Sequence, residues 1–177
     1  MKHRERIAAA LDHREADRVP VDLGASESSG IMGIAYNRLK QRLGVGGRTQ
    51  IYDLSQMIAK VERPVLDAVG ADAMPLLIEP REWKPWELQD GSPAEIPAKL
   101  NVVRRDNADL EIAADDGTVT SRCPAGSVYF DGVYHPLADA TTVEEIDAAQ
   151  PDFESFDWSS CFDETYDDLA AKARDLH

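Results

Sequence analysis

The predicted fold depends on one short apolar stretch, Val19-Pro20-Val21-Asp22-Leu23-Gly24. It has the length of a strand, its proline forces extended geometry on the preceding residue, and a glycine ends it. A second stretch of the same kind is Ala73-Met74-Pro75-Leu76-Leu77-Ile78. We expect both to be buried strands. Helical patterns lie between them at residues 31–43 and 54–69, the latter with a new turn at Pro64, and the order predicts a parallel βαβ unit.

The chain changes character at residue 81. A short helix over residues 3–13 precedes the first predicted strand, so the βαβ start occupies residues 1–80. Residues 81–138 contain the turn signals Asp90-Gly91 and Asp116-Gly117 between short alternating pieces. This pattern indicates an antiparallel β meander inserted into the fold.

The C-terminal part, residues 139–177, is helical in period and strongly acidic. Thr141 or Thr142 is placed to cap its first helix. Twelve Asp or Glu stand against two basic residues here. This part is therefore either a solvated helical surface or a docking face for a basic partner. We expect residues 1–177 to form a single domain.

Composition excludes several classes of protein. The formal charge is −14 and the isoelectric point is near 4.6. Such an acidic surface repels nucleic acid and anionic lipid, so neither is an expected partner. No apolar run approaches the roughly 20 residues of a membrane helix, and the N-terminus lacks the layout of a signal peptide. We expect a cytoplasmic protein whose two isolated cysteines are reduced.

A longer motif surrounds the first predicted strand: Asp12-His13-Arg14-Glu15-Ala16-Asp17-Arg18-Val19-Pro20-Val21-Asp22. It resembles the opening of the uroporphyrinogen decarboxylase superfamily, which also contains cobalamin-linked methyltransferases. The segments 52–59, 66–72 and 129–137 continue the likeness, which thus covers nearly the whole chain.

The resemblance implies an α/β fold, namely a (β/α)8 TIM barrel. Such a barrel needs about 250 residues, and this chain has 177. We therefore expect a partial barrel with an inserted antiparallel meander, an N-terminal fragment of a longer enzyme. Its exposed edge strands would pair with a missing C-terminal half or with a second copy in a homo-oligomer.

Two carboxylates are the candidate catalytic residues, because reactive groups in such barrels lie at the C-terminal ends of strands. Asp22 lies near the end of the first predicted strand, and Glu79 follows the second. Glu79 is the nearest match to the acidic group that stabilises or protonates the pyrrole ring in the family decarboxylases. The alternative for both is a carboxylate that caps or pairs at a strand end. Arg18 precedes the strand, so we expect it to pair with a carboxylate rather than to act in catalysis.

The loop of residues 24–30 supplies the candidate substrate-binding residues Ser26, Ser28 and Ser29, whose alternative role is to cap the following helix. His135 is a further candidate for substrate binding, or it packs at a sheet edge. The loop contains no arginine, whereas the porphyrin enzymes resemble one another in an arginine-rich loop that pairs with substrate carboxylates. The resemblance is therefore closer to the methyltransferase branch than to true uroporphyrinogen decarboxylase.

Cofactors follow from the same resemblance. The methyltransferase branch uses zinc bound by His and Cys ligands late in the barrel, and no His-x-Cys occurs here. We expect no metal and no cofactor in this chain, and zinc and a corrinoid in a full-length parent.

Three functions remain open. The first is corrinoid-linked methyl transfer or demethylation by the parent, with a small-molecule substrate and a corrinoid protein as partner. The second is uroporphyrinogen decarboxylation in porphyrin biosynthesis, a lyase reaction. The third is a non-catalytic half-barrel that assembles with a partner chain. We expect this chain alone to be inactive.

Overall fold

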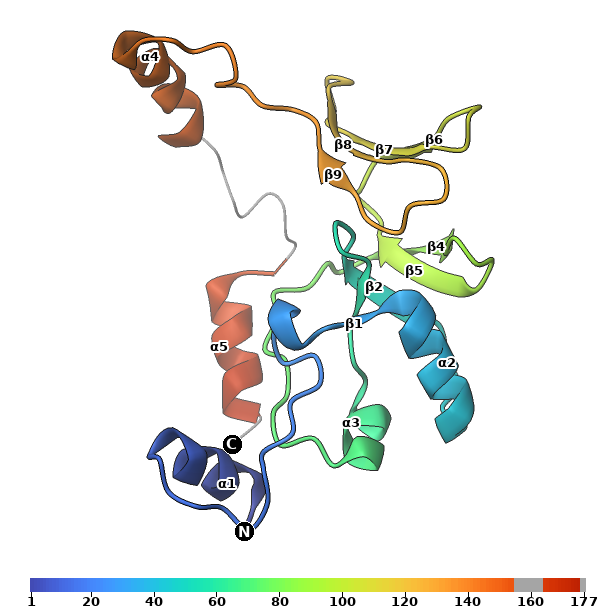
Figure 1. Cartoon of the computed structure of the whole chain (residues 1–177), viewed down its shortest axis with the longest axis vertical. Helices are drawn as coiled ribbons and strands as arrows, with labels where there is room; N and C mark the ends of the chain where they lie inside the picture. Colours follow the sequence, from blue (N-terminus) through green and yellow to red (C-terminus); the bar gives the residue numbers. More distant parts are fainter. Residues whose placement is uncertain (155–163, 176–177) are drawn as a thin grey trace.

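The computed structural model describes residues 1–154 and 164–175, which form two sheets with helices around them (Figure 1). The helices are α1 (His3–Leu11), α2 (Gly33–Leu43), α3 (Arg63–Val69), α4 (Val143–Glu154) and α5 (Tyr166–Asp175), with a 3-10 turn η1 (Glu27–Ser29). The first sheet contains β1 (Ile31–Met32), β2 (Thr49–Asp53), β3 (Ile58–Ala59), β4 (Trp83–Glu87) and β5 (Pro93–Pro97), in the order β1-β3-β2-β5-β4. The second contains β6 (Val102–Arg104), β7 (Leu110–Ala113), β8 (Val119–Cys123) and β9 (Asp131–Gly132), in chain order.

The predicted partial (β/α)8 TIM barrel is wrong. A barrel needs parallel strands, each followed by a helix. Here the strands pair mainly in antiparallel fashion, and among the described strands β2 and β5 are the one parallel pair, with Thr49 opposite Ala94. Of the antiparallel meander predicted over 81–138, only β6 to β9 form one, in a sheet of their own; β4 and β5 pair with each other in the first sheet, where β5 also runs parallel to β2.

The two stretches expected to be buried strands, 19–24 and 73–78, are not strands and form no ladder. Asp72 N–H donates to the Val21 carbonyl at 2.7 Å, which brings residues 19–24 and 73–78 to one place. The N–H of Val21, however, donates to the Asp72 carboxylate at 2.9 Å instead of to a backbone carbonyl. Because a side chain takes this donor, strand pairing does not continue, and Val19 and Leu76 remain exposed.

The helix predicted over 54–69 is replaced by a tight turn, strand β3 and then α3. The Asp53 carboxylate accepts the N–H of Ser55 at 2.8 Å, and this local bond offers the backbone an alternative to the helix. Met57 then adopts a φ of 56°, which a helix interior does not allow. The new turn predicted at Pro64 is confirmed, because α3 begins there with proline in its first turn.

The remaining helices largely follow the sequence pattern. Helix α1 falls within the predicted residues 3–13, and α2 covers most of 31–43 and ends at Gly44 with a φ of 69°, a left-handed conformation that glycine adopts without strain. Thr142 caps α4: its Oγ1 accepts the N–H of Glu145 at 3.2 Å. The Glu145 carboxylate in turn accepts the N–H of Thr142 at 3.1 Å, a reciprocal capping box.

One hydrophobic core runs from α2 and α3 through the first sheet into the second. Its buried side chains are Tyr36, Ile51, Leu54, Met57, Ala59, Val61, Val65, Leu66, Leu88, Ala94, Ile96, Leu110, Cys123 and Phe130. The start of α2 sits tightly on the sheet, since a Cβ at Gly33 would lie 2.5 Å from a methyl group of Ile51. The second sheet is tied to the first where Phe130 N–H donates to the Ser55 carbonyl at 2.9 Å.

Buried polar contacts fix α2 against the start of α3. The Tyr36 hydroxyl accepts the N–H of Glu62 at 2.8 Å and donates to its carboxylate at 3.1 Å. Burial raises the pKa of the Tyr36 hydroxyl, so it stays protonated and can donate this bond. The Lys40 ammonium, almost fully buried, lies 2.5 Å from the same carboxylate.

The N-terminal segment is bound to the body through Asp72, whose side chain is fully buried. This carboxylate pairs with Arg6, with Arg18 at 2.6 Å and with His3 Nδ1 at 2.8 Å. Arg6 also donates to Asp17 at 2.6 Å, which joins α1 to the segment that follows it. The expectation that Arg18 pairs with a carboxylate is therefore confirmed.

The charge on Asp72 is stabilised by its donors. Burial alone would raise the pKa of this carboxyl, but bonds from Val21 N–H, His3, Arg18 and Arg6 outweigh burial and hold the pKa well below its usual range. The Asp17 pKa is also lowered, first by the hydrogen bond from Arg6.

We predict that Asp72→Asn destabilises the fold. The amide keeps the shape of the side chain but leaves Arg6 and Arg18 without their shared anion, so the melting temperature should fall by more than about 5 °C. The matched control is Asp67→Asn, which removes an exposed carboxylate paired with Arg63 on α3 and should cost less than about 2 °C. Equal losses in both variants, measured by circular dichroism, would contradict this account.

The stability difference between wild type and Asp72→Asn should depend on pH. A carboxylate whose pKa is lowered by folding contributes stability that is complete above its unfolded pKa of about 4 and is lost as pH falls toward the folded pKa. The melting-temperature difference between wild type and Asp72→Asn should therefore stay constant from about pH 7 to 5 and shrink below about pH 4. A difference that persists unchanged down to about pH 2 would show that the charge of Asp72 is not responsible.

Candidate functional site

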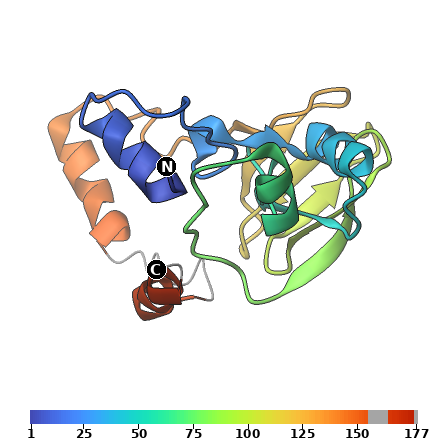
Figure 2. The ribbon, with the colours of Figure 1, turned by 90° about the horizontal axis from the view of Figure 1, so that it is seen from below.

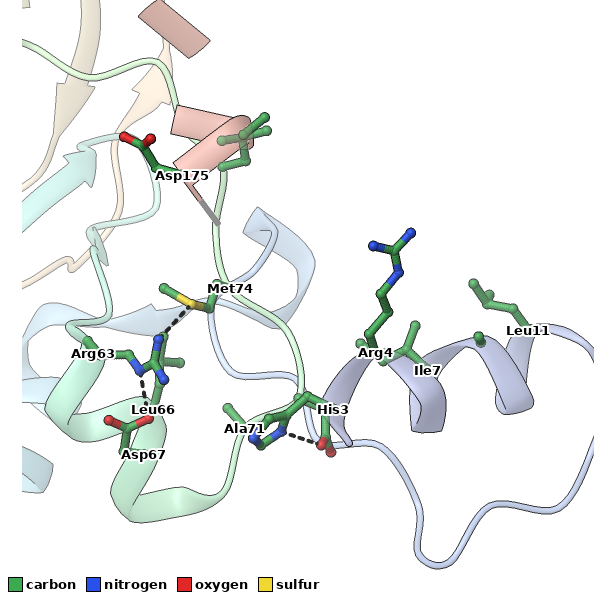
Figure 3. A pocket seen from close by; sticks show the side chains of 14 residues that line it. His3, Arg4, Ile7, Leu11, Arg63, Leu66, Asp67, Ala71, Met74 and Asp175 are labelled. Carbon is green, nitrogen blue, oxygen red and sulfur yellow. Dashed lines mark hydrogen bonds and ion pairs between the residues drawn. The ribbon is translucent and has the colours of Figure 1, made fainter. Parts of the chain in front are cut away.

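A concave surface lies between α1, α3 and α5 (Figure 3). It is an open groove of about 790 Å³. Seen from below, α1 (blue) and α5 (dark red) lie apart from α3 (green), and the chain that follows α3 runs between them (Figure 2). Residues 71–76, which follow α3 and are here called the extended segment, pass between the helices and complete the lining.

The walls of the groove are largely apolar. Helix α1 contributes Ile7, Ala8 and Leu11, α3 contributes Leu66, the extended segment contributes Ala71, Met74 and Leu76, and α5 contributes Ala173. Three of these side chains are exposed although they are large: Leu11 at 75%, Met74 at 39% and Leu76 at 42% of their surface. Water therefore meets a group of hydrophobic side chains gathered in one hollow, which is typical of binding surfaces.

Charged groups line the same groove. Arg63 donates to Asp67 at 2.7 Å and points a second nitrogen at the Met74 sulfur, 3.6 Å away (Figure 3). His3 Nδ1 is bound to buried Asp72, so its ring is held in one orientation while its side chain stays 64% exposed. The groove thus offers a guanidinium and an oriented imidazole beside apolar walls, a combination suited to a mainly apolar molecule with one polar end.

The groove shows no grouping for metal chemistry. Across residues 1–154 and 164–175, no three His, Cys, Asp or Glu side chains lie close enough together to hold a metal ion. The cysteine that the structure describes, Cys123, is buried with a free thiol that donates to the Ser127 carbonyl at 3.5 Å.

The predicted catalytic carboxylates lie in structural contacts. Asp22 is exposed, and its Oδ1 accepts the N–H of Ala25 at 3.0 Å, closing its own loop. Glu79 is 21% exposed and lies 2.6 Å from Lys60 and 3.4 Å from Lys172. No hydrogen bond or ion pair within the described part of the chain joins Asp22 to Glu79.

Glu79 belongs to a charge network that attaches α5. Lys172 on α5 donates to Glu164 at 2.5 Å and to the Leu77 carbonyl at 3.2 Å, in addition to its contact with Glu79. Burial tends to lower the Lys172 pKa, but these acceptors outweigh burial and raise it, so the ammonium stays charged. The Glu79 backbone N–H also donates to Glu164 at 2.9 Å.

The predicted substrate-binding residues fall in two separate places. Ser26 and Ser29 bind each other across η1, with their hydroxyl oxygens 3.3 Å apart, and Ser28 is exposed beside them. His135 is exposed in the stretch after β9. The serines thus serve the local turn η1; they do not cap α2, whose N-cap residue Met32 makes no side-chain capping bond. None of these four residues, nor Asp22 or Glu79, lines the groove.

Sequence reasoning missed the groove because its residues come from distant segments. His3, Arg63, Met74 and Asp175 become neighbours only after folding. Within the segment 66–72 of the resemblance, Asp72 is a groove residue that could have pointed to this place.

Comparison with known proteins gives no relative. No protein-family model matches the chain, and neither a curated protein nor a solved structure matches it. In addition, none of the described helices is long and apolar enough to cross a membrane.

We predict that Lys172→Met loosens α5 without unfolding the body. Methionine keeps the aliphatic stem but removes the bonds to Glu79, Glu164 and the Leu77 carbonyl. The amides of α5 should exchange with solvent at least about tenfold faster, and the melting temperature should fall by roughly 2–4 °C. Arg174→Met, an exposed change on the same helix, is the control. Unchanged exchange in Lys172→Met would mean that another contact holds α5.

Proposed function

We propose that this chain is a ligand-binding module whose groove between α1, α3 and α5 takes a small, largely apolar molecule. The groove itself carries the proposal: its volume of about 790 Å³ lies within the roughly 300–1,000 Å³ of small-molecule sites. When a ligand removes the exposed Leu11, Met74 and Leu76 of the groove from water, the free energy of the system falls. Arg63 and His3 suit a ligand with one polar or anionic end.

The state of the candidate carboxylates supports binding over catalysis. A general acid or base must reach the reacting atoms. Asp22 is engaged with its own loop, and Glu79 is held between two lysines at the attachment of α5. Neither residue faces the groove.

A test uses the fluorescent probe 1-anilinonaphthalene-8-sulfonate, which combines apolar rings with one anionic group. We expect saturable binding to the wild-type chain and affinity at least about tenfold weaker in the double variant Met74→Asp, Leu76→Asp, because both changes put charge on the groove wall. The control is Val143→Asp with Ile146→Asp, which changes two exposed apolar residues on α4. The proposal fails if the control loses as much affinity as the groove variant, or if neither loses any.

The resemblance supports a second proposal, a role in corrinoid-linked methyl transfer or demethylation. Three residues of the resembling motif, Asp17, Arg18 and Val21, make contacts in the network around Asp72. Uroporphyrinogen decarboxylation is the weaker alternative, because the loop 24–30 has no arginine. A cytoplasmic location is part of this second proposal.

This second proposal predicts saturable binding of methylcobalamin to this chain, measured by equilibrium dialysis. The absence of binding would remove the second proposal for this chain. Conversion of uroporphyrinogen in a parallel assay would favour the lyase instead.

A further inference from the structure

A second unpartnered surface lies far from the groove. Residues 131–148, here called the acidic arm, lead from β9 through an extended stretch into the first turns of α4. Figure 1 shows α4 lying apart from both sheets. Every residue of the arm except Ala140 is exposed.

The arm combines exposed hydrophobic side chains with charge of one sign. Its large apolar residues are Val133, Tyr134, Leu137, Val143 and Ile146, exposed by 42%, 54%, 38%, 67% and 43% respectively. Its charged residues are Asp131, Asp139, Glu144, Glu145 and Asp147. The sequence contains no Lys or Arg anywhere between Arg122 and Lys172, so nothing in the arm neutralises these acids.

The helical part of the arm is formed before any partner binds. Thr142 and Glu145 close a capping box, and Thr141 donates its N–H to the same Glu145 carboxylate at 2.7 Å. Val143 and Ile146 are three residues apart and therefore share one face, and Glu144 and Asp147 repeat the same spacing beside them. A helix with an apolar row next to an acidic row is thus presented to solvent.

We propose that the acidic arm is a docking segment for a basic protein surface. An apolar groove on that partner receives Val143 and Ile146, and its Lys or Arg side chains pair with Glu144 and Asp147. Charge complementarity selects this occupant: a second copy of a chain with charge −14, a nucleic acid and an anionic membrane are all repelled by the acids. Helix-in-groove binding uses residues at this i, i+3 spacing as anchors. The inference is independent of the groove between α1, α3 and α5.

The probe is a fluorescein-labelled peptide of 14 residues, about four helical turns, built from Leu and Lys so that one face is apolar and the other basic. Its binding to the full chain is followed by fluorescence anisotropy. We expect the double variant Val143→Ser, Ile146→Ser to bind at least about tenfold more weakly than wild type, and Glu144→Gln, Asp147→Asn to lose a similar factor. Neither variant touches the capping box, and circular dichroism checks that α4 persists.

The matched control lies on the other acidic helix. Tyr166→Ser with Asp167→Asn removes one exposed apolar side chain and one exposed acid from α5, and should bind the peptide as wild type does. An oligolysine of the same length should bind more weakly and be indifferent to Val143→Ser, Ile146→Ser, because it has no apolar face.

Three results would overturn the proposal. The first is no binding of the Leu/Lys peptide, or equal binding by wild type and Val143→Ser, Ile146→Ser. The second is an equal loss of binding in the α5 control. The third is a dimer in sedimentation that dissociates in the Val143→Ser, Ile146→Ser variant, which would identify a second copy as the occupant.

Discussion

Asp72 holds together segments that are up to 69 residues apart in the chain. Its buried carboxylate receives His3, Arg6 and Arg18 side chains and the N–H of Val21, while its own N–H returns to the Val21 carbonyl. A buried carboxylate is tolerated because these donors compensate for its lost hydration. The position of α1 relative to the body depends on this one anion.

The groove between α1, α3 and α5 and the acidic arm both expose apolar side chains to solvent, for different reasons. The buried Asp72 attaches α1 to the segment 71–76, and Lys172 attaches α5 to the Leu77 carbonyl. Two charge networks therefore hold two walls of the apolar groove in place. The acidic arm is the opposite case, since residues 131–148 are almost entirely exposed. Polar contacts thus fix the walls of the groove, while the arm presents apolar side chains that the fold has not buried.

Local signals predicted those elements that local chemistry determines. Gly44 follows the last residue of α2, Pro64 is the second residue of α3 and Thr142 caps α4, each as the sequence indicates, because such residues act on their own backbone. Apolar content alone misassigned 19–24 and 73–78 as buried strands. Whether extended chain becomes sheet depends on which group takes each N–H, and here the Asp72 side chain takes that of Val21. Those two strands predicted a parallel βαβ unit and the resemblance implied a barrel, and the described residues form neither. The groove was beyond local reasoning, because its residues meet only through these long-range contacts.

The most direct test is an NMR titration of the Asp72 carboxyl carbon in the intact chain, assigned by comparison with Asp72→Asn. If the carboxylate is buried among His3, Arg6, Arg18 and the Val21 N–H, its pKa lies well below the ordinary range, and its signal should not titrate as pH is lowered through about 4. A full titration step with a midpoint near 4 would contradict the account. It would show a hydrated carboxyl, and the N-terminal segment would then not be held against the body as described.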